Sequence, residues 1–134
     1  MTFHVERIDH VVLRCRDLGG MVRFYEQALG FNVERRLDRI SLVQMRAGAS
    51  LLDLIAAERP QDAATDAAAN MDHLCFRIEP FDRDAIVTRL APFGISVGET
   101  VERYGAEGNG PSVYFHDPEG NQIELKGPAV TPAH

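Results

Sequence analysis

The chain contains a divergent internal repeat, and this repeat limits the possible folds more than any other feature. The stretch "IDHVVLRC" at 8–15 returns as "MDHLCFRI" at 71–78, an offset of 63 residues. The stretch "SLVQMRAGASLLDLIA" at 41–56 matches "SVYFHDPEGNQIELKG" at 112–127 with an offset of 71 throughout, Ser41 falling on Ser112. Self-similarity of this kind indicates a repeated supersecondary unit. About seven extra residues are therefore expected in the second copy, and "ERYGAEGNG" at 102–110 offers a place for them.

Each copy has the pattern of one strand, one helix and three further strands. The first helix is expected over 18–29, where apolar residues recur at helical spacing, and the second over 83–91. Asp17 and Asp82 precede these helices as candidate N-caps. Gly30 follows the first helix, where a left-handed stop is usual. We therefore predict an α+β fold of two tandem βαβββ modules, forming a curved, cup-like mixed sheet with the helices on the outside.

The repeat also predicts how the chain is divided. With 134 residues, the chain has the length of a single domain. We expect one domain over 1–134, composed of a first module (about 6–57), a polar linker (about 58–70), a second module (about 71–127) and a C-terminal tail (128–134).

Two histidines and two carboxylates occupy matching places in the two copies. Side chains along a strand alternate between the two faces of its sheet. In this pattern the apolar residues pack under a helix, and the other face carries His10, Asp53, His73 and Glu124. If the two sheets face each other, these four side chains converge in one cup. Two imidazoles and two carboxylates form a donor set suited to a divalent metal ion.

Simpler explanations exist for each of these residues. A carboxylate between two apolar residues is common on the solvent side of an antiparallel strand. Cys75 shares the face of His73, and is either an inert packed thiol, a ligand or a nucleophile. Ser112, Tyr114 and His116 alternate along one strand; they either contact a substrate or are ordinary polar sheet residues. The pattern alone leaves these alternatives open.

Charge and composition restrict the partners. The net charge is −6, from 14 basic and 20 acidic residues, which argues against nucleic acid or an anionic membrane surface. No stretch approaches the roughly 20 apolar residues of a membrane span. The two cysteines do not form a disulfide framework, so a cytoplasmic location is expected. A small molecule is the remaining class of partner.

Three longer stretches together resemble the vicinal oxygen chelate superfamily. They are "IDHVVLRCRDLGGMVRFYEQALGF", "MDHLCFRI" and "SVYFHDPEGNQIELKG". This superfamily includes glyoxalase I, fosfomycin-resistance proteins, extradiol dioxygenases and bleomycin-resistance proteins, and the similarity covers about residues 6–127. By position, the resemblance implies metal ligation by His10, His73 and Glu124. Asp53 falls where glyoxalase I carries a glutamate; being one methylene shorter, it ligates either directly or through a water.

The resemblance implies an enzyme that uses one divalent ion to hold two neighbouring oxygens of a small substrate. A lyase or isomerase of glyoxalase type, working through a metal-stabilised enolate, is the first expectation, with Asp53 and Glu124 as catalytic residues. The alternatives are an Fe(II) ring-cleaving dioxygenase, a fosfomycin-type thiol transferase or hydrolase, and a metal-free drug-binding protein. Ni, Zn, Mn, Fe and Co all suit the donors. The resemblance also implies a homodimer and substrate contacts from Ser112, Tyr114, His116 and Arg103.

Overall fold

A computed structural model describes residues 5–57, 71 and 73–132 of the chain. The chain separates into two compact units, Met1–Ala63 and Ala64–His134. The described residues of each unit follow the same order of strand, helix and three strands. This confirms the predicted α+β class and the βαβββ repeat. The predicted linker over 58–70 and the end of the tail lie outside the described residues.

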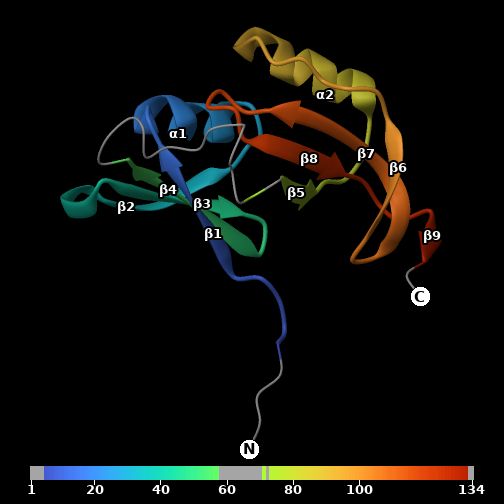
Figure 1. Cartoon of the computed structure of the whole chain (residues 1–134), viewed down its shortest axis with the longest axis horizontal. Helices are drawn as coiled ribbons and strands as arrows, with labels where there is room; N and C mark the ends of the chain where they lie inside the picture. Colours follow the sequence, from blue (N-terminus) through green and yellow to red (C-terminus); the bar gives the residue numbers. More distant parts are fainter. Residues whose placement is uncertain (1–4, 58–70, 72, 133–134) are drawn as a thin grey trace, which may run out of the picture. The chain divides into compact units, whose positions relative to one another are not determined.

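Unit 1 carries a four-stranded mixed sheet with a helix on one face (Figure 1). The sheet order is β1-β4-β3-β2; β1 runs parallel to β4, and the other neighbours are antiparallel. Helix α1 packs on the strands β2, β3 and β4. The elements are β1 (His10–Cys15), α1 (Leu18–Gln27), β2 (Asn32–Leu37), the 3-10 helix η1 (Asp38–Ile40), β3 (Leu42–Ala47) and β4 (Ser50–Ala56).

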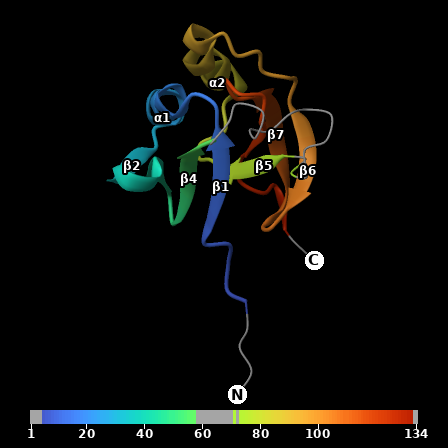
Figure 2. The same cartoon turned by 60° about the vertical axis from the view of Figure 1, so that its left-hand side comes forward.

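Unit 2 repeats this arrangement with the order β5-β8-β7-β6, and β5 is again parallel to β8 (Figures 1 and 2). A short fifth strand, β9, pairs with β7. The elements are β5 (Leu74–Arg77), α2 (Arg83–Leu90), the 3-10 helix η3 (Ala91–Phe93), β6 (Val101–Gly105), β7 (Gly108–His116), β8 (Gln122–Lys126) and β9 (Thr131–Pro132). The identical strand order places corresponding strands of the two units in the same surroundings.

The predicted caps of both helices and the predicted glycine stop of the first helix are confirmed. The Asp17 carboxylate accepts a hydrogen bond from the backbone N of Gly20 at 3.0 Å, and the Asp82 carboxylate accepts one from Ala85 N at 3.3 Å. Gly30 has φ of 75°, the left-handed conformation that glycine adopts without a steric penalty. Both α-helices end slightly earlier than predicted, and α2 continues as η3 because Pro92 cannot supply a backbone N–H.

One face of each sheet is apolar and buried, as the alternation predicts. In unit 1 the face toward α1 includes Leu13, Met45 and Leu54, none of them more than 7% exposed. Burying several such side chains, at about 1.5–3 kcal/mol each, provides the main stabilisation of a small unit. In unit 2 the corresponding buried residues are Ile86, Leu90, Val113, Phe115, Ile123 and Leu125. The opposite faces are therefore free to carry polar side chains.

Strand register shows where the extra residues of the second copy lie. Leu37 pairs with Leu42 across β2 and β3, five positions along the chain, whereas Val101 pairs with Ser112, eleven positions along. The β6–β7 hairpin thus holds six extra residues, as predicted for 102–110. One more lies in the β7–β8 turn, so the assumption of a constant offset of 71 is wrong for β7. Ser112 matches Leu42 in register and not Ser41.

The motif "HDPEGNQ" forms the turn between β7 and β8. The buried Asp117 carboxylate accepts hydrogen bonds from the backbone N atoms of Glu119 and Asn121, at 2.9 and 3.0 Å. The Asn121 amide also donates to Asp117, and Gly120 has φ of 86°. These contacts stabilise the backbone of a tight turn. The part of the motif that precedes β8 is therefore explained by folding alone.

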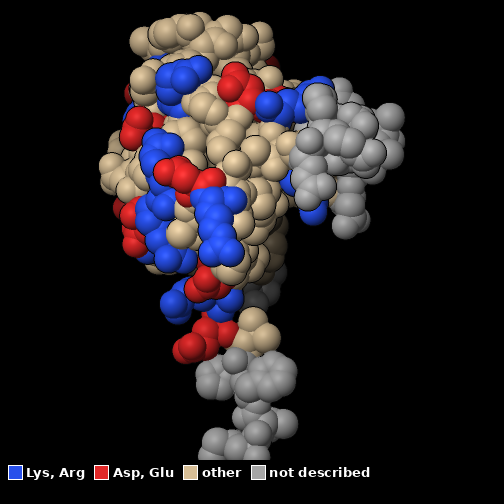
Figure 3. All heavy atoms as spheres, turned by 90° about the vertical axis from the view of Figure 1, so that its left-hand side faces the viewer, with Lys and Arg blue, Asp and Glu red and all other residues tan. Residues whose placement is uncertain are grey.

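The surface carries both signs of charge. Figure 3 shows one face of the molecule on which basic and acidic side chains intermingle. The exposed Glu34 of β2 forms an ion pair with Arg46 of β3, with the charged atoms 3.2 Å apart. In the part of the chain that the structure describes, no helix is long and apolar enough to cross a membrane.

Candidate functional site

The polar face of unit 1 carries His10 and Asp53 from two parallel, adjacent strands. Asp53 of β4 lies opposite Val12 of β1, so His10 is two positions away on the same face. Asp53 is only 4% exposed. Gln44 of β3, its cross-strand partner, donates from Nε2 to Asp53 Oδ2 at 3.1 Å. Asp53 Oδ1 is buried and has no hydrogen-bond donor among the described residues.

An arginine on the edge strand fixes the orientation of Gln44. Arg35 of β2 pairs with Gln44 across the sheet and donates from Nε to its Oε1. Because the amide oxygen is taken by Arg35, the amide N–H₂ group faces Asp53. These two hydrogen bonds, from Arg35 to Gln44 and from Gln44 to Asp53, leave one carboxylate oxygen of Asp53 bonded and the other open. A buried carboxylate oxygen without a donor costs about 1–3 kcal/mol, so Asp53 Oδ1 is available to accept a cation or a proton.

His10 is oriented by its neighbour in the sequence. Its Nδ1 lies 2.8 Å from Asp9 Oδ2, and the side chain is 48% exposed. The hydrogen bond to Asp9 raises the pKa of His10 above its ordinary value, and the negative charge of Asp53 adds to this effect. With Nδ1 bonded to a carboxylate, Nε2 is the nitrogen available to a ligand.

The polar face of unit 2 carries the matching pair in direct contact. His73 precedes β5, and Glu124 of β8 lies opposite Cys75, so the separation of two positions seen in unit 1 recurs. His73 Nε2 lies 3.2 Å from Glu124 Oε1. The buried Ser112 hydroxyl donates to Glu124 Oε2 at 2.7 Å. Both oxygens of Glu124, which is 5% exposed, thus have partners.

Tyr114 and Arg103 complete the surroundings of Glu124. Tyr114, the cross-strand partner of Glu124, lies edge-on to His73 with ring centroids 5.6 Å apart. The guanidinium carbon of Arg103 lies 5.8 Å from the Tyr114 ring centroid. Burial raises the pKa of Tyr114, hydrogen bonding to Arg103 opposes this, and Glu124 adds to the rise. Tyr114 therefore stays a neutral hydrogen-bond donor at neutral pH.

Cys75 is a poor nucleophile in this position. Burial of its sulfur raises the pKa of the thiol to about 12, and the charge and hydrogen bonding of Glu124 contribute. Only the thiolate attacks electrophiles, so the reactive fraction at neutral pH is very small. Of the options that the sequence leaves open for Cys75, the geometry favours an inert thiol.

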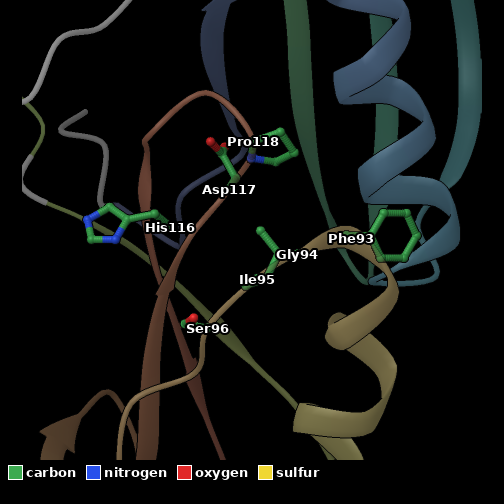
Figure 4. Close-up of a pocket in the computed structure, with 7 residues that line it drawn as sticks. All are labelled: Phe93, Gly94, Ile95, Ser96, His116, Asp117 and Pro118. Atoms are coloured by element: carbon green, nitrogen blue, oxygen red, sulfur yellow. The ribbon is translucent and has the colours of Figure 1, made fainter.

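His116 lies two positions beyond Tyr114 on the same face of β7. It ends β7 opposite Gln122 and is exposed. It lines a hollow of about 460 Å³ in unit 2 (Figure 4). The other lining residues are Phe93, Gly94, Ile95, Ser96, Asp117 and Pro118. The structure thus brings Ser112 and Tyr114 to Glu124 and Arg103 to Tyr114, whereas His116 lines the hollow at the end of β7.

The two units present equivalent pairs of one histidine and one carboxylate. Within the described residues, no group of three or more His, Cys, Asp or Glu side chains is gathered closely enough to hold a metal. Each unit alone offers two donors, from His10 with Asp53 and from His73 with Glu124. Imidazole nitrogens and carboxylate oxygens are the donors of many divalent-metal enzymes. The open Asp53 Oδ1 also fits such an ion, which would satisfy a buried acceptor.

Sequence reasoning missed Gln44 and Arg35. The sequence did contain a signal for Gln44, because Gly48 and Ala49 predict a tight hairpin between β3 and β4. A tight hairpin fixes the register of its two strands. In that register Gln44 lies opposite Asp53. The position of Arg35 depends on an irregularity in β2 between Val33 and Arg35, which alternation could not predict.

Comparison with known proteins identifies relatives over nearly the whole chain. The model of the Glyoxalase/Bleomycin resistance protein/Dioxygenase superfamily matches residues 7–125. "Virulence protein STM3117" of Salmonella typhimurium is 36% identical over 124 residues, covering 90% of this chain and 83% of the relative. "Glyoxylase I 4" of Arabidopsis thaliana is 28% identical over 131 residues, covering 91% and 71%.

Solved structures give the same grouping. The crystal structure of the Salmonella typhimurium virulence protein matches with a TM-score of 0.72 and 29% identity, covering 95% of this chain and all of that one. A lactoylglutathione lyase from Agrobacterium tumefaciens matches with a TM-score of 0.64 and 25% identity, covering 92% and 94%. A fosfomycin-resistance protein from Listeria monocytogenes, at 17% identity and a TM-score of 0.72 over 95% and 97%, shares the fold.

Proposed function

Because the chain belongs to the Glyoxalase/Bleomycin resistance protein/Dioxygenase superfamily, we propose that it is a divalent-metal-dependent enzyme of glyoxalase type, a lyase or isomerase acting on a small oxygen-rich molecule. The observation that carries this proposal is the duplicated pair of histidine and buried carboxylate. A lone pair of this kind has an ordinary structural explanation. Its recurrence at equivalent register in both units favours a common role.

His10, His73, Glu124 and Asp53 would hold the ion. The donors are two nitrogens and two oxygens, which suits Ni, Zn, Mn, Fe or Co. His10 Nδ1 is held by Asp9 at 2.8 Å, whereas His73 Nε2 lies 3.2 Å from Glu124, itself a proposed ligand. A contact like that between His10 and Asp9 orients a ligating group and raises its basicity. The shorter Asp53 would ligate through Oδ1, which has no other partner among the described residues.

A bound divalent ion would supply Lewis-acid stabilisation of negative charge on substrate oxygens. The protein groups would supply the remaining chemistry. When Oδ1 is off the ion, Asp53, held through Oδ2 by Gln44, would accept a proton at Oδ1 and return it to the adjacent carbon. Ser112 would keep Glu124 in place, and Tyr114 and Arg103 would donate hydrogen bonds to the substrate. His116, two positions beyond Tyr114 on the same face of β7, would contact the substrate from the hollow that it lines.

A dioxygenase is the second candidate. The favouring observation is that Asp53 is shorter than Glu124 and does not contact its histidine. Ligation by His10, His73 and Glu124 alone would give the two-histidine, one-carboxylate set of non-haem Fe(II) oxygenases. Oxygen consumption with a catechol, in protein loaded with Fe(II), distinguishes this candidate. A fosfomycin-directed thiol transferase or hydrolase would instead be detected as protection of cells from that antibiotic.

The proposal is tested by metal analysis and by one assay. We expect about one divalent ion per chain after loading and dialysis, and loss of that ion in His73→Ala. His116→Ala is the matched control, because it removes an exposed histidine of the same unit and should keep the ion. The loaded protein should consume a thiol–aldehyde adduct, followed by its absorbance. An ion content near zero, with no difference between the two variants, would overturn the metal proposal.

We also propose that the protein forms a homodimer and is located in the cytoplasm. A homodimer would be detected by sedimentation, and a cytoplasmic location by fractionation. The free cysteines Cys15 and Cys75 are compatible with a reducing compartment.

A further inference from the structure

Three side chains form a hydrogen-bonded row across the sheet of unit 1. Arg35 of the edge strand β2 donates from Nε to Gln44 Oε1, and Gln44 Nε2 donates to Asp53 Oδ2 at 3.1 Å. The three residues are paired in register on the neighbouring strands β2, β3 and β4. The row ends at Asp53 Oδ1, a buried oxygen that has no hydrogen-bond partner in the described part of the chain.

The two ends of this row fix the orientation of its middle member. A guanidinium group only donates hydrogen bonds, and an ionised carboxylate only accepts them. The Gln44 amide has one acceptor atom and one donor atom, so it fits between the two ends in a single orientation. Without a donor at Arg35, the amide would be free to rotate by half a turn and place Oε1 against Asp53, where two acceptors would face each other. Arg35 therefore decides whether Asp53 receives a donor.

Unit 2 contains a similar row built from different residues. Tyr114 is the cross-strand neighbour of Glu124, and the guanidinium carbon of Arg103 lies 5.8 Å from the centroid of the tyrosine ring. A hydroxyl, like an amide, both accepts and donates, and Tyr114 has side-chain hydrogen bonds with Arg103 and with Glu124. Arg103 lies opposite Gly110, so it reaches Tyr114 from a different register. The order of arginine, middle residue and carboxylate thus recurs, with each arginine on an edge strand.

We propose that Arg35 is a positioning residue for Asp53: by holding the Gln44 amide, it fixes the rotation of the carboxylate and presents Oδ1 alone. Asp53 is then a single-oxygen ligand or proton acceptor, and not a group that chelates through both oxygens. This inference rests on the proposed function for what Oδ1 binds, whereas the row of hydrogen bonds exists without the metal. Arg35 acts through Gln44, from two strands away.

Two substitutions of Arg35 separate its hydrogen bond from its charge. In Arg35→Gln the side-chain nitrogen is attached to Cδ, as Nε is in arginine, so a donor is kept and the charge is lost. In Arg35→Met a methyl group takes the same place, and both are lost. Arg36→Met is the matched control, because Arg36 is exposed and follows Arg35 on the same strand. It pairs with Val43, so its side chain points to the face opposite Gln44.

The first measurement is hydrogen exchange of the Gln44 side-chain amide, followed by NMR in metal-free protein and assigned by its absence from Gln44→Leu. We expect exchange about fivefold faster in Arg35→Met, the change that corresponds to one neutral hydrogen bond, and exchange near that of wild type in Arg35→Gln and Arg36→Met. Equal exchange in wild type and Arg35→Met would overturn the inference. So would equally fast exchange in Arg35→Met and Arg35→Gln, because the charge and not the donor would then be responsible.

The second measurement is zinc affinity, by competition with a chromophoric chelator. Arg35→Met should lower it about tenfold, as expected for a group behind a ligand, whereas Arg35→Gln should retain it. In protein that carries Asp53→Asn, Arg35→Met should change the affinity by less than about twofold, because its effect passes through the carboxylate. Unchanged affinity in Arg35→Met, or an undiminished loss in the Asp53→Asn background, would overturn the inference. Exchange at Gln44 that depends on Arg35, without zinc binding by wild type, would reject the proposed function alone.

Discussion

The two units use the same backbone frame for two different carboxylate environments. In unit 2, Glu124 reaches His73 at 3.2 Å and has partners on both oxygens. In unit 1, Asp53 has one bonded and one open oxygen, and His10 turns to Asp9 instead. The strand register around each histidine and carboxylate is the same in both units. The difference in hydrogen bonding therefore comes from the extra methylene of Glu124 and from the cross-strand neighbour of each carboxylate. The comparison shows how a duplicated scaffold can hold one carboxylate between two partners and leave the other with an open oxygen.

The largest expected effect comes from removing either carboxylate charge. Glu124→Gln should lower divalent-metal affinity by more than the roughly 10- to 100-fold that a positioning residue costs, because it removes a ligand and the partner of His73. Asp53→Asn should cost about tenfold, because the shorter side chain is the weaker ligand. Competition with a chromophoric chelator measures both. Equal losses would mean that the two units contribute alike.

Stability of the metal-free protein tests the hydrogen bonds behind each carboxylate. Gln44→Leu should lower the free energy of unfolding by about 2 kcal/mol, because Asp53 is then buried with no donor on either oxygen. Ser112→Ala should cost about 1 kcal/mol, because Glu124 keeps His73. Urea denaturation measures both. Gln122→Leu is the control, because Gln122 lies on the same face of β8 as Glu124. Its free energy of unfolding should change by less than about 0.5 kcal/mol. A Ser112→Ala loss exceeding that of Gln44→Leu would contradict the comparison.

Titration of His10 tests the different partner of the first histidine. Asp9→Asn should lower the pKa of His10 toward its ordinary value, since the hydrogen bond to Asp9 is the main cause of the rise. A raised pKa means that the stabilising contact is complete below the ordinary pKa and is lost as pH rises through the raised value. Proton NMR of the metal-free protein follows the shift. An unchanged His10 titration in the variant would show that Asp53 alone controls it.

The smallest effect is expected at Cys75. With a pKa of about 12, its thiol should react slowly with iodoacetamide at pH 7, despite partial exposure. Glu124→Gln should speed the reaction, because it removes one cause of the raised pKa. Cys75→Ser should leave metal affinity unchanged within about twofold, a change too small to indicate ligation. Rapid alkylation of the wild type would restore the nucleophile alternative.

Much of the fold follows from local signals in the sequence. Asp17 and Asp82 cap the helices because a short side-chain oxygen before an apolar stripe bonds the free backbone N–H groups. Gly30 stops the first helix because only glycine adopts positive φ without cost. Alternation separated His10 and Glu124 from the apolar face because a strand has a period of two. These rules act over a few residues and need no knowledge of distant partners.

What the sequence by itself determined is therefore the repeat, the element order and which side chains share a face. Only the tertiary structure decided which carboxylate oxygen is open and that Arg35 orients Gln44. These facts depend on register across several strands and on the reach of individual side chains. Such contacts join residues distant in the chain, and their energies are set by burial, which sequence periodicity cannot specify.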